Sequence, residues 1–337
     1  MTYGTRALVT GAAGFIGSNF VRYLSARQWR VRALDVHAAP AELAGLDVDF
    51  RQQDLRDAAA LARALEDVEV VFHLASVHLD VAAADAEFES VNVAAVAQLV
   101  AACASARVRR LVHVSSVGVY GHVVSVPAAE NAPLGPINTY EKTKCAGERA
   151  ALEAARRCNV DLVIVRPSWV YGPGCPRTDK LLRALQKGRF FYIGAGRNLR
   201  HPVYIDDFLA ALVLAAGAGP EVSGRIFNVA GPRWMTVEEM VNTFAQALGS
   251  APPRLRIPRW LGLGAGWAAE LAGRMLGINP PISRRTLAFF ENDNAFDISA
   301  ARQMLHYEPR TGLLEGVRQT LSLRGADAGE TVRGGPV

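Results

Sequence analysis

The chain has 337 residues, half of them hydrophobic and a fifth charged, a balance typical of globular proteins. At about 150 residues per domain, this length predicts two domains or one large domain. The net charge of +5 is spread along the chain and does not form the basic stripe of a nucleic-acid-binding protein. Together these features argue against a collagen, a coiled coil, a small disulfide scaffold and a dedicated DNA-binding protein.

Four cysteines without a CxxC pair predict reduced thiols and a cytoplasmic protein. The N-terminus soon enters an apolar run at residues 6–10, without the basic region and cleavage site of a secretion signal. Residues 260–278 are long enough to raise the question of a membrane span, but they contain Glu270, Arg274 and five glycines. No membrane span is therefore expected there, and a helix over a binding site is predicted instead.

Short β-branched runs alternate with longer helical stretches through the first 170 residues. Strands are predicted at residues 6–10, 30–35, 48–53, 68–74, 109–115 and 161–166. Helices are predicted between them at residues 14–27, 57–65, 83–106 and 138–158. This alternation is typical of a Rossmann-type, doubly wound α/β domain, with a parallel sheet covered by helices on both faces.

After residue 172 the alternation weakens, because proline and glycine become frequent. A strand at 225–229 is expected to return to the sheet, and further helices are predicted at 237–248, 260–276 and 312–323. The predicted organisation is a dinucleotide-binding domain over 1–172, a smaller mixed α/β substrate domain over 173–323, and a disordered tail over 324–337.

A glycine loop follows the first predicted strand and opens a helix. Gly11, Gly14 and Gly17 form a GxxGxxG pattern, which permits a tight turn and brings backbone close to a pyrophosphate at a helix N-terminus. Asp35 ends the second predicted strand, where its carboxylate can accept hydrogen bonds from the adenosine ribose and would repel a 2′-phosphate. Because no lysine or arginine follows Asp35 directly, NAD is favoured over NADP.

Asp54 follows the third predicted strand. Asp54 and Leu55 lie where they could border the adenine of a bound dinucleotide. Aspartate is also a preferred residue at a helix N-cap, and a helix is predicted at 57–65. Both interpretations of Asp54 stay open at this point.

Two segments carry groups suited to proton transfer. Tyr140 and Lys144 lie one helical turn apart on one face of a predicted helix, and Ser115 and Ser116 end the fifth predicted strand. A tyrosine with a pKa of about 10 is a poor base at neutral pH, but a nearby ammonium and a nicotinamide cation favour the phenolate. These groups suit removal of a proton from a secondary alcohol while hydride passes to NAD.

In this order the motifs are similar to those of the extended short-chain dehydrogenase/reductase family, also called the NAD-dependent epimerase/dehydratase family. The resemblance covers the chain to about residue 323. It implies that Tyr140 is the base, that Lys144 lowers its pKa and binds the nicotinamide ribose, and that Ser116 positions the substrate hydroxyl, with Ser115 as the alternative. The matching residues are Gly11, Gly14, Gly17, Asp35, His73, Leu74, Ala75, Asn92, Ser116, Tyr120, Tyr140, Lys144, Arg166, Pro167 and the run 170–174.

The resemblance also implies where NAD binds. The residues expected to contact it lie in the glycine loop, near the carboxyl ends of the predicted strands and on the helix at 138–158. They are Gly11, Gly14, Phe15, Ile16, Gly17, Asp35, Asp54, Leu55, Leu74, Ala75, Ser76, Asn92, Tyr140, Lys144 and Pro167. No metal ion is expected.

The C-terminal half is expected to shape the substrate pocket. Arg200 matches the family arginine that clamps a nucleotide diphosphate, a task that the planar guanidinium suits; the alternative is a surface arginine. Trp169 stands where many sugar-modifying members carry asparagine, and residues 255–261 are similar to bacterial 3β-hydroxysteroid dehydrogenase-like members with apolar pockets. Aromatic residues that could line such a pocket are Trp169, Phe190, Phe191, Trp260 and Trp267.

Two hypotheses for the activity follow. The first is an NAD-dependent enzyme that oxidises a hydroxyl of a nucleotide sugar, with 4-epimerisation as the favoured reaction. The second is a dehydrogenase or ketoreductase of a hydrophobic, steroid-like alcohol. Sugar 4,6-dehydration is not expected, because Val117 and Gly118 replace the Asp-Glu pair of those enzymes.

A third possibility, a cofactor-binding protein without catalysis, conflicts with the intact Ser116, Tyr140 and Lys144. The resemblance further implies a homodimer, in which the helices at 83–106 and 138–158 form a four-helix bundle with their mates. The expected ligand is a small molecule, and neither nucleic acid nor a membrane is expected as a partner.

Overall fold

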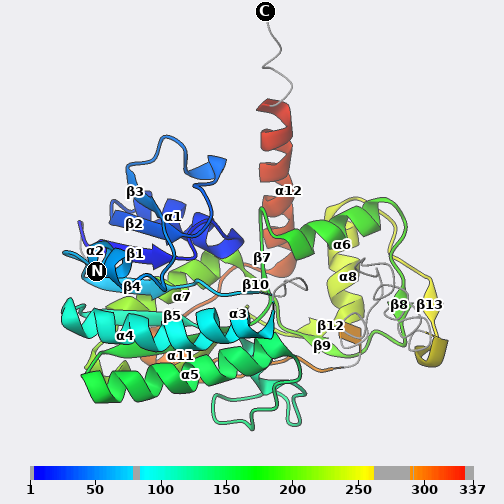
Figure 1. The fold of residues 1–337 in the computed structure, drawn as a ribbon. Helices are drawn as coiled ribbons and strands as arrows, with labels where there is room; N and C mark the ends of the chain where they lie inside the picture. The colour runs from blue at the N-terminus through cyan, green and yellow to red at the C-terminus, as the bar shows by residue number, and fades with distance from the viewer. Residues whose placement is uncertain (1–3, 79–83, 262–288, 291, 331–337) are drawn as a thin grey trace, which may run out of the picture.

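The computed structural model describes residues 4–78, 84–261, 289–290 and 292–330, and at its centre lies a seven-stranded parallel sheet (Figure 1). Its strands are β1 (Arg6–Thr10), β2 (Arg30–Asp35), β3 (Val48–Gln52), β4 (Val70–His73), β5 (Arg110–Val114), β6 (Leu162–Pro167) and β11 (Ile226–Val229). The spatial order is β11-β6-β5-β4-β1-β2-β3. This order confirms the predicted Rossmann-type sheet, and it reverses between β1 and β4, the place where such sheets bind ligands.

Alternating side chains bury both faces of the sheet. Ala7 and Val9 contact the layer that contains α1 (Phe15–Ser25) and α7 (Ile205–Gly217), whereas Leu8 contacts the opposite layer. That opposite layer contains α2 (Ala58–Ala64), α4 (Ala95–Ser105) and α5 (Thr139–Cys158). As predicted, β11 returns to the sheet and pairs in parallel with β6.

The remaining elements gather mainly beside the carboxyl end of the sheet, on the right of Figure 1. The helices there are α6 (Pro176–Gln186) and α8 (Val237–Ala247), and α11 (Ser299–Leu305) lies against β11. Three two-stranded pairs complete this part: β7 (Val170–Tyr171) with β10 (Val203–Tyr204), β8 (Tyr192–Ile193) with β13 (Arg256–Ile257), and β9 (Leu199–Arg200) with β12 (Met235–Thr236). Three short 3₁₀ turns are η1 (Ala41–Leu43), η3 (Val117–Tyr120) and η4 (Pro220–Val222).

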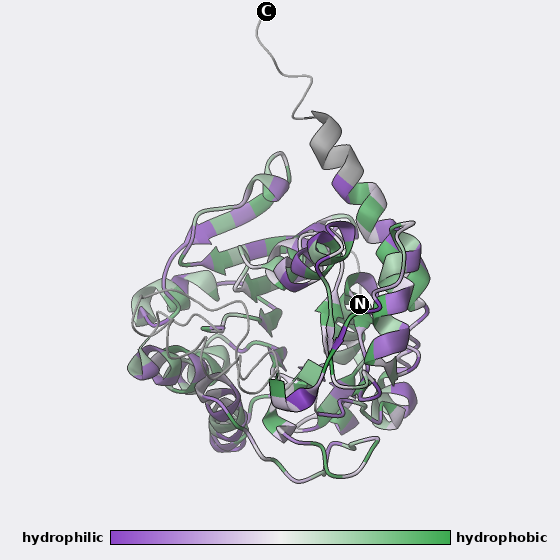
Figure 2. Cartoon of the chain, turned by 90° about the vertical axis from the view of Figure 1, so that its right-hand side faces the viewer, coloured by the Kyte–Doolittle hydropathy of each residue, from purple (hydrophilic) through white to green (hydrophobic). Residues whose placement is uncertain are grey.

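Helix α12 (Leu313–Glu330) is longer than the sequence predicts. It begins against α8 and β10, where Val317 and Thr320 are fully buried, and then projects from the body of the molecule (Figures 1 and 2). Extending an anchored helix costs much less than starting one, so the helix continues through 324–330, where a disordered tail was predicted. Residues 331–337 and most of the helix predicted at 260–276 lie outside the described residues.

The helix predicted at 83–106 forms in three parts: α3 (Asp85–Glu89), a π-helical turn η2 (Ser90–Ala94) and α4. By length and composition alone, Asp85–Ser105 is apolar enough to cross a membrane, with a mean hydropathy of 1.4. Within this fold its buried side lies between the sheet and α5. A helix that contributes to the core of an α/β protein is equally long and apolar, so length and composition do not by themselves indicate a membrane span.

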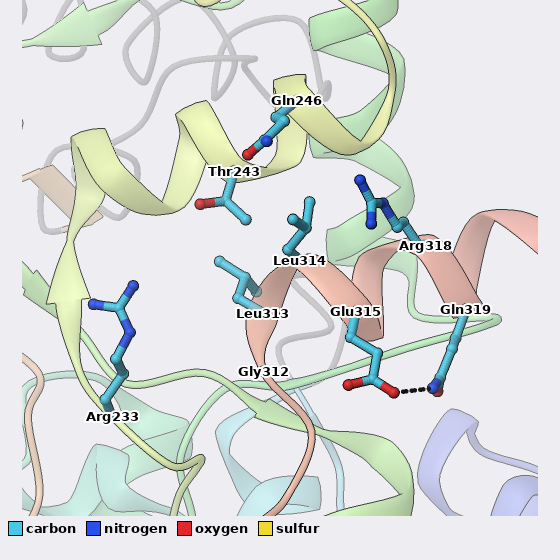
Figure 3. Close-up of a pocket in the computed structure, with 9 residues that line it drawn as sticks. All are labelled: Arg233, Thr243, Gln246, Gly312, Leu313, Leu314, Glu315, Arg318 and Gln319. Carbon is cyan, nitrogen blue, oxygen red and sulfur yellow. Dashed lines mark hydrogen bonds between the residues drawn. The ribbon is translucent and has the colours of Figure 1, made fainter.

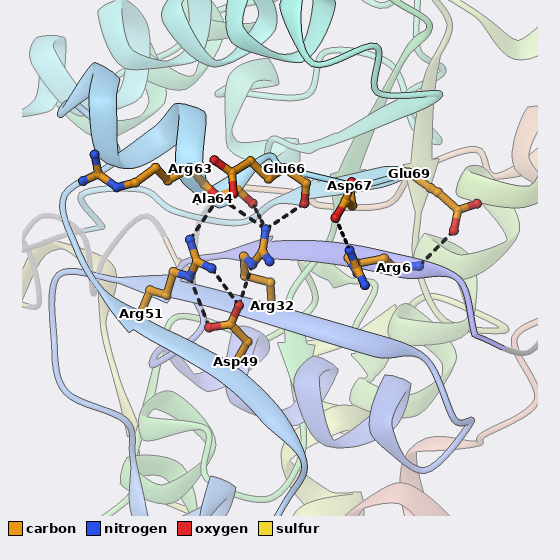
Figure 4. A network of polar contacts seen from close by, with 9 residues as sticks. All are labelled: Arg6, Arg32, Asp49, Arg51, Arg63, Ala64, Glu66, Asp67 and Glu69. Carbon is orange, nitrogen blue, oxygen red and sulfur yellow. Dashed lines mark hydrogen bonds and ion pairs between the residues drawn. The ribbon is translucent and has the colours of Figure 1, made fainter.

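A network of arginines joins β2 and the edge strand β3 to the end of α2 (Figure 4). Arg32 donates from one guanidinium nitrogen to the carbonyl of Ala64, the last residue of α2, at 2.8 Å, and to that of Glu66, just after the helix, at 2.9 Å. Asp49 accepts from Arg32 at 2.7 Å and from Arg51 at 3.0 Å. The network satisfies carbonyls that the end of a helix leaves unpaired, and none of these residues is a predicted site residue.

Candidate active site

The glycine loop is held against the neighbouring strand end by two glycines that tolerate no side chain. Gly11 has a φ of +72°, and a Cβ there would lie 2.6 Å from the amide nitrogen of Ala75. A Cβ on Gly17 would lie 2.0 Å from the carbonyl oxygen of Gly11. Both glycines are therefore required by the packing of the protein itself.

Gly14 differs from its two neighbours in the motif. A Cβ at Gly14 would meet only the carbonyl oxygen of Gly11, at an ordinary 3.4 Å. Gly14 is also the N-cap of α1 and makes no side-chain cap, so the helix presents its first amides, at Phe15 and Ile16, toward this space. The open side of Gly14 fits a pyrophosphate that approaches the backbone closely.

Asp35 stands beside this loop, almost buried, with 9% of its surface exposed. Its carboxylate accepts hydrogen bonds from the amides of Ala13 and His37, both at 2.9 Å, and the His37 Nδ1 lies 3.0 Å away. These contacts hold the carboxylate at the carboxyl end of β2. That placement fits the predicted contact with the adenosine ribose.

Gly14→Ala is expected to weaken NAD binding by at least about tenfold, because the new Cβ occupies the side open to the pyrophosphate. The free protein should lose at most about 1 kcal/mol of unfolding free energy, the usual cost of alanine at an N-cap. Calorimetric titration with NAD and thermal unfolding without it measure the two effects. Gly312→Ala is the matched control, since a Cβ there meets no atom within 4 Å; unchanged NAD affinity in Gly14→Ala would contradict the assignment.

Asp54 does not cap the helix, so that interpretation is wrong. Asp57 is the N-cap of α2 and accepts from the amides of Ala59 and Ala60 at 2.9 and 3.0 Å. Asp54 instead binds the guanidinium of Arg56, whose hydrogen bonds lower the pKa of the Asp54 carboxyl. The contact of Asp54 and the buried Leu55 with an adenine stays a prediction.

The predicted catalytic residues meet where α5 begins and β5 ends. Lys144 is buried, and its Nζ donates to the carbonyl of Val114 at 2.7 Å. The hydroxyl of Ser116 accepts from the amide of Gly118 at 3.0 Å and so keeps its own hydrogen for another acceptor. Ser115 is more deeply buried, and its hydroxyl has no hydrogen-bond partner in the described part of the chain. This difference favours Ser116 as the hydroxyl that meets a substrate.

Burial lowers the pKa of Lys144 to about 8, and the charge of Glu148 one turn further along α5 acts in the opposite direction. Two buried histidines lie close by: His73 on β4 and its cross-strand partner His113 on β5, with stacked rings 5.2 Å apart. Burial lowers the pKa of His73 to about 3 and that of His113 also well below its usual value. Both rings are neutral at pH 7, which leaves Lys144 as the one cation in this group.

Asn92 joins the loop after β4 to helix α5. Its side-chain oxygen accepts from the Ser76 hydroxyl and the Val77 amide at 3.0 and 2.9 Å, and its amide donates to the Thr143 hydroxyl at 3.1 Å. A Cβ on Gly147 would lie 2.2 Å from the Asn92 carbonyl, so only glycine permits this close approach. Asn92 thus positions the helix that carries Tyr140 and Lys144, and its direct contact with NAD stays a prediction.

The other predicted cofactor residues lie at the carboxyl ends of neighbouring strands. Leu74, Ala75 and Ser76 follow β4, which pairs with β1, and Pro167 ends β6, which pairs with β5. Parallel strands bring their carboxyl ends to one edge. The fold therefore gathers these residues beside the glycine loop.

Arg200 is not a surface arginine, since only 4% of its surface is exposed. One guanidinium nitrogen donates to the carbonyls of Leu199 and Asn292, the other to the carbonyl of Phe289, and the group lies 4.6 Å from the Phe289 ring centroid. Burial lowers the pKa of Arg200 to about 10. Its role as a diphosphate clamp stays a prediction, and in this structure its fork binds backbone carbonyls.

Aromatic side chains surround Trp169. Its ring is parallel to Phe244, with the centroids 6.2 Å apart, and edge-on to Phe289 at 6.4 Å. Phe190 packs edge-on against Tyr192 at 5.3 Å. The remaining predicted pocket residues differ: Phe191 is half-buried, Trp260 is 71% exposed, and Trp267 lies outside the described residues.

Two residues near Tyr140 were not predicted from the sequence. The ring of His78 contacts Tyr140 edge-on, with centroids 4.6 Å apart. Arg177, near the start of α6, interacts electrostatically with Tyr140 and with Arg200. No local pattern marks either residue, because the contact of His78 and the charge interaction of Arg177 with Tyr140 both arise only when separate segments fold together.

A hollow on another part of the molecule lies between α8 and the beginning of α12 (Figure 3). Arg233, Thr243, Arg318 and the hydrogen-bonded pair Glu315 and Gln319 are among its lining residues. It contains none of the predicted site residues. Among the described residues, no cluster of three His, Cys, Asp or Glu side chains is placed to hold a metal ion.

The sequence pattern of the NAD dependent epimerase/dehydratase family matches residues 7–247. The chain belongs to this family. It is therefore an NAD-dependent enzyme of the extended short-chain dehydrogenase/reductase type, and the open side of Gly14 and the carboxylate of Asp35 fit that cofactor. When bound, NAD accepts and returns a hydride.

The family relatives of the chain include two kinds of enzyme. A UDP-glucose 4-epimerase of Mycolicibacterium smegmatis is 31% identical over 94% of this chain and 97% of its own length. A 3beta-hydroxysteroid-dehydrogenase/decarboxylase of Arabidopsis thaliana is 28% identical over 93% of this chain and 78% of its own. The family thus establishes the cofactor and the fold, and the substrate is a separate question.

Similar solved structures also include proteins with different ligands and activities. MoeE5 in complex with UDP-glucuronic acid and NAD is 27% identical, with a TM-score of 0.76 over 96% of this chain and 99% of that one. DesIV, a dTDP-glucose 4,6-dehydratase of Streptomyces venezuelae with NAD bound, is 27% identical, with a TM-score of 0.78 over 97% and 98%.

Proposed function

We propose that the protein oxidises a secondary hydroxyl of a nucleotide sugar reversibly, and that its net reaction is 4-epimerisation. The observation that carries the proposal is the junction of α5 with β5. There the fixed ammonium of Lys144, one helical turn from Tyr140, lies at the strand end that Ser116 follows. Relatives named as UDP-glucose 4-epimerases support this choice of substrate and reaction.

Each of the three residues has one task in the proposed reaction. The phenolate of Tyr140 takes the proton of the substrate hydroxyl and later returns it. The ammonium of Lys144 favours that phenolate, and the Ser116 hydroxyl donates a hydrogen bond to the same substrate oxygen. Epimerisation further requires the oxidised sugar to turn before it recovers hydride on its other face.

We do not assign dehydratase activity, although DesIV is among the similar structures. Elimination of water needs a carboxylate beside the reacting sugar, and Val117 and Gly118 supply none. Glu141 does approach Gly118: a Cβ added to Gly118 would lie 3.1 Å from the Cγ of Glu141. Its carboxylate is committed to a capping box and accepts from the amides of Ile137 and Asn138.

The second candidate is a dehydrogenase of a hydrophobic alcohol. The aromatic surroundings of Trp169, with Phe244 and Phe289, favour it, because they offer apolar surface in the substrate region. A relative named as a 3beta-hydroxysteroid-dehydrogenase/decarboxylase supports it as well. Both candidates use Tyr140 and Lys144 in the same way, so the substrate distinguishes them.

We also propose a cytoplasmic homodimer. Only 39% of the apolar window in Asp85–Ser105 is buried within one chain, and this helix packs beside α5. A second copy that covers both helices would bury the remaining apolar surface. Light scattering of the purified protein measures its molar mass and so tests the homodimer directly.

Thermal unfolding with saturating NAD, and with UDP, dTDP, GDP or CDP added separately, tests the nucleotide-sugar proposal. A nucleotide at 100 times its Kd stabilises by about 2.7 kcal/mol, which is expected to raise the Tm of a chain of this length by about 4 °C. One effective nucleotide would support the proposal and name the carrier. If none of the four raises Tm, the nucleotide-sugar proposal fails and hydrophobic alcohols become the substrates to assay.

A further inference from the structure

Helix α5 carries two buried charges of opposite sign one turn apart. Lys144 is 4% exposed and Glu148 2% exposed, and side chains four positions apart on a helix lie on one face and readily form an ion pair. These two form none, although both belong to the described part of the chain. The Lys144 ammonium instead donates to the carbonyl of Val114 at 2.7 Å. Both carboxylate oxygens of Glu148 accept from Arg166, at 2.9 and 2.6 Å.

The two strands that receive these charges are neighbours in the sheet. Val114 is the last residue of β5, and Arg166 lies on β6, which pairs with β5 in parallel. A guanidinium that donates two hydrogen bonds to one carboxylate is a strong and directional partner. The sheet therefore holds the cation of α5 on one strand and the anion of α5 on the next.

The guanidinium of Arg166 is fixed on its other side as well. Its Nη1 donates to the Tyr120 hydroxyl at 2.8 Å and to the Glu130 carbonyl at 3.1 Å, and its Cζ lies 4.9 Å from the centroid of the Tyr120 ring. The Tyr120 hydroxyl donates in turn to Asn228 on β11 at 2.7 Å. Because all three guanidinium nitrogens have partners, the fork of Arg166 stays directed at Glu148.

We propose that Arg166 is a positioning residue for the reaction: it holds both oxygens of Glu148 and so prevents Glu148 from drawing the Lys144 ammonium away from the end of β5. This rests on the proposed role of Lys144, whose ammonium favours the phenolate of Tyr140. Removing one partner of a buried ion pair leaves the other charge uncompensated. Without Arg166, the carboxylate of Glu148 is left one helical turn from Lys144, and an ammonium paired with it no longer favours the phenolate.

The charges around Lys144 are consistent with this role of Arg166. Burial lowers the pKa of Lys144 to about 8, and the charge of Glu148 acts against that effect. His73 and His113 also interact with Lys144, but burial lowers the pKa of both rings below the usual value, so both are neutral at pH 7. Neither histidine can therefore replace Arg166 as the counter-ion of Glu148.

The test is a titration of Tyr140 in the protein with saturating NAD and no substrate, followed by the ultraviolet absorbance of the phenolate. Each variant is compared with the same variant that also carries Tyr140→Phe, so that the signals of the other tyrosines cancel. Arg166→Met is expected to shift the midpoint upward by about one pH unit or more, the usual effect of losing an opposite charge nearby. The double variant Arg166→Met with Glu148→Leu should reverse most of this shift. His78 and Arg177, which also interact with Tyr140, are the same in every variant.

Two further variants complete the comparison. Arg110→Met is the matched control, since Arg110 is also a buried arginine, 2% exposed and bonded to Asp161 at 2.6 Å, but lies at the opposite end of β5. It should leave the midpoint unchanged. If Arg166→Met does not fold by circular dichroism, Arg166→Lys takes its place, because it keeps a buried cation but cannot hold both oxygens as a planar fork does. Its midpoint should shift upward by a smaller amount, and Glu148→Leu added to it should reverse the shift.

Lys144→Met gives the benchmark that separates this inference from the proposed function. A raised midpoint in Lys144→Met and an unchanged one in Arg166→Met overturn the inference and leave the role of Lys144 intact. A midpoint that stays raised when Glu148→Leu is added assigns Arg166 a purely structural role and also overturns the inference. If Lys144→Met leaves the midpoint unchanged, the proposed role of Lys144 and the inference both fail. None of these outcomes depends on the substrate, so thermal unfolding with nucleotides remains a separate test.

Discussion

Tyr140→Phe is expected to lower turnover by about 10²- to 10⁴-fold, the usual contribution of a positioned acid–base group. Phenylalanine keeps the ring and its contact with His78 but removes the oxygen that takes the substrate proton. Binding of NAD and of the nucleotide should remain within a few-fold of wild type, since Lys144 keeps its bond to Val114. Steady-state kinetics with a sugar on the nucleotide that raises Tm in the thermal-unfolding experiment, together with NAD titration, measures both effects.

The matched control for this variant is Tyr192→Phe. Tyr192 is buried, and its hydroxyl donates to Asn242 at 3.3 Å, away from α5. Removing that hydroxyl should leave turnover close to wild type. Near-normal turnover of Tyr140→Phe, with the fold intact, would show that another group is the base.

Arg166→Met is expected to lower the free energy of unfolding by about 3–5 kcal/mol, because it leaves a buried carboxylate without its partner. Arg166 and Glu148 are each 2% exposed, and two hydrogen bonds of 2.9 and 2.6 Å join them. Arg166 also donates to the Tyr120 hydroxyl at 2.8 Å and to the Glu130 carbonyl at 3.1 Å. Urea unfolding of the free protein measures the loss.

Two further variants make the stability measurement decisive. The double variant Arg166→Met with Glu148→Leu should lose less than the sum of the two single changes, since no charge stays buried alone. Arg310→Met removes an exposed partner of Glu308, a pair 3.3 Å apart, and should cost less than about 1 kcal/mol. A cost for Arg166→Met as small as that of Arg310→Met would refute the role of the buried pair.

Local sequence patterns were sufficient to predict the sheet and the glycine loop between β1 and α1. β-branched runs, glycine spacing and helix caps act between residues a few positions apart, so their effect is visible in the chain. The seven sheet strands lie within two residues of the predicted spans, and β11 joins β6. Asp54 shows the limit of this approach, because it and Asp57 are equally good caps by residue type, and only the start of α2 separates them.

The sequence by itself therefore determined the fold class, the NAD cofactor and the position of Tyr140 and Lys144 one turn apart on one helix. Only the tertiary structure decided the environment of the buried arginines: Arg200 binds the carbonyl of Phe289, 89 positions away, and Arg166 binds the carbonyl of Glu130, 36 positions away. The physical reason is that a charged side chain acquires its role from the partners and the burial that folding provides. Those partners come from distant segments, and no local spacing encodes them.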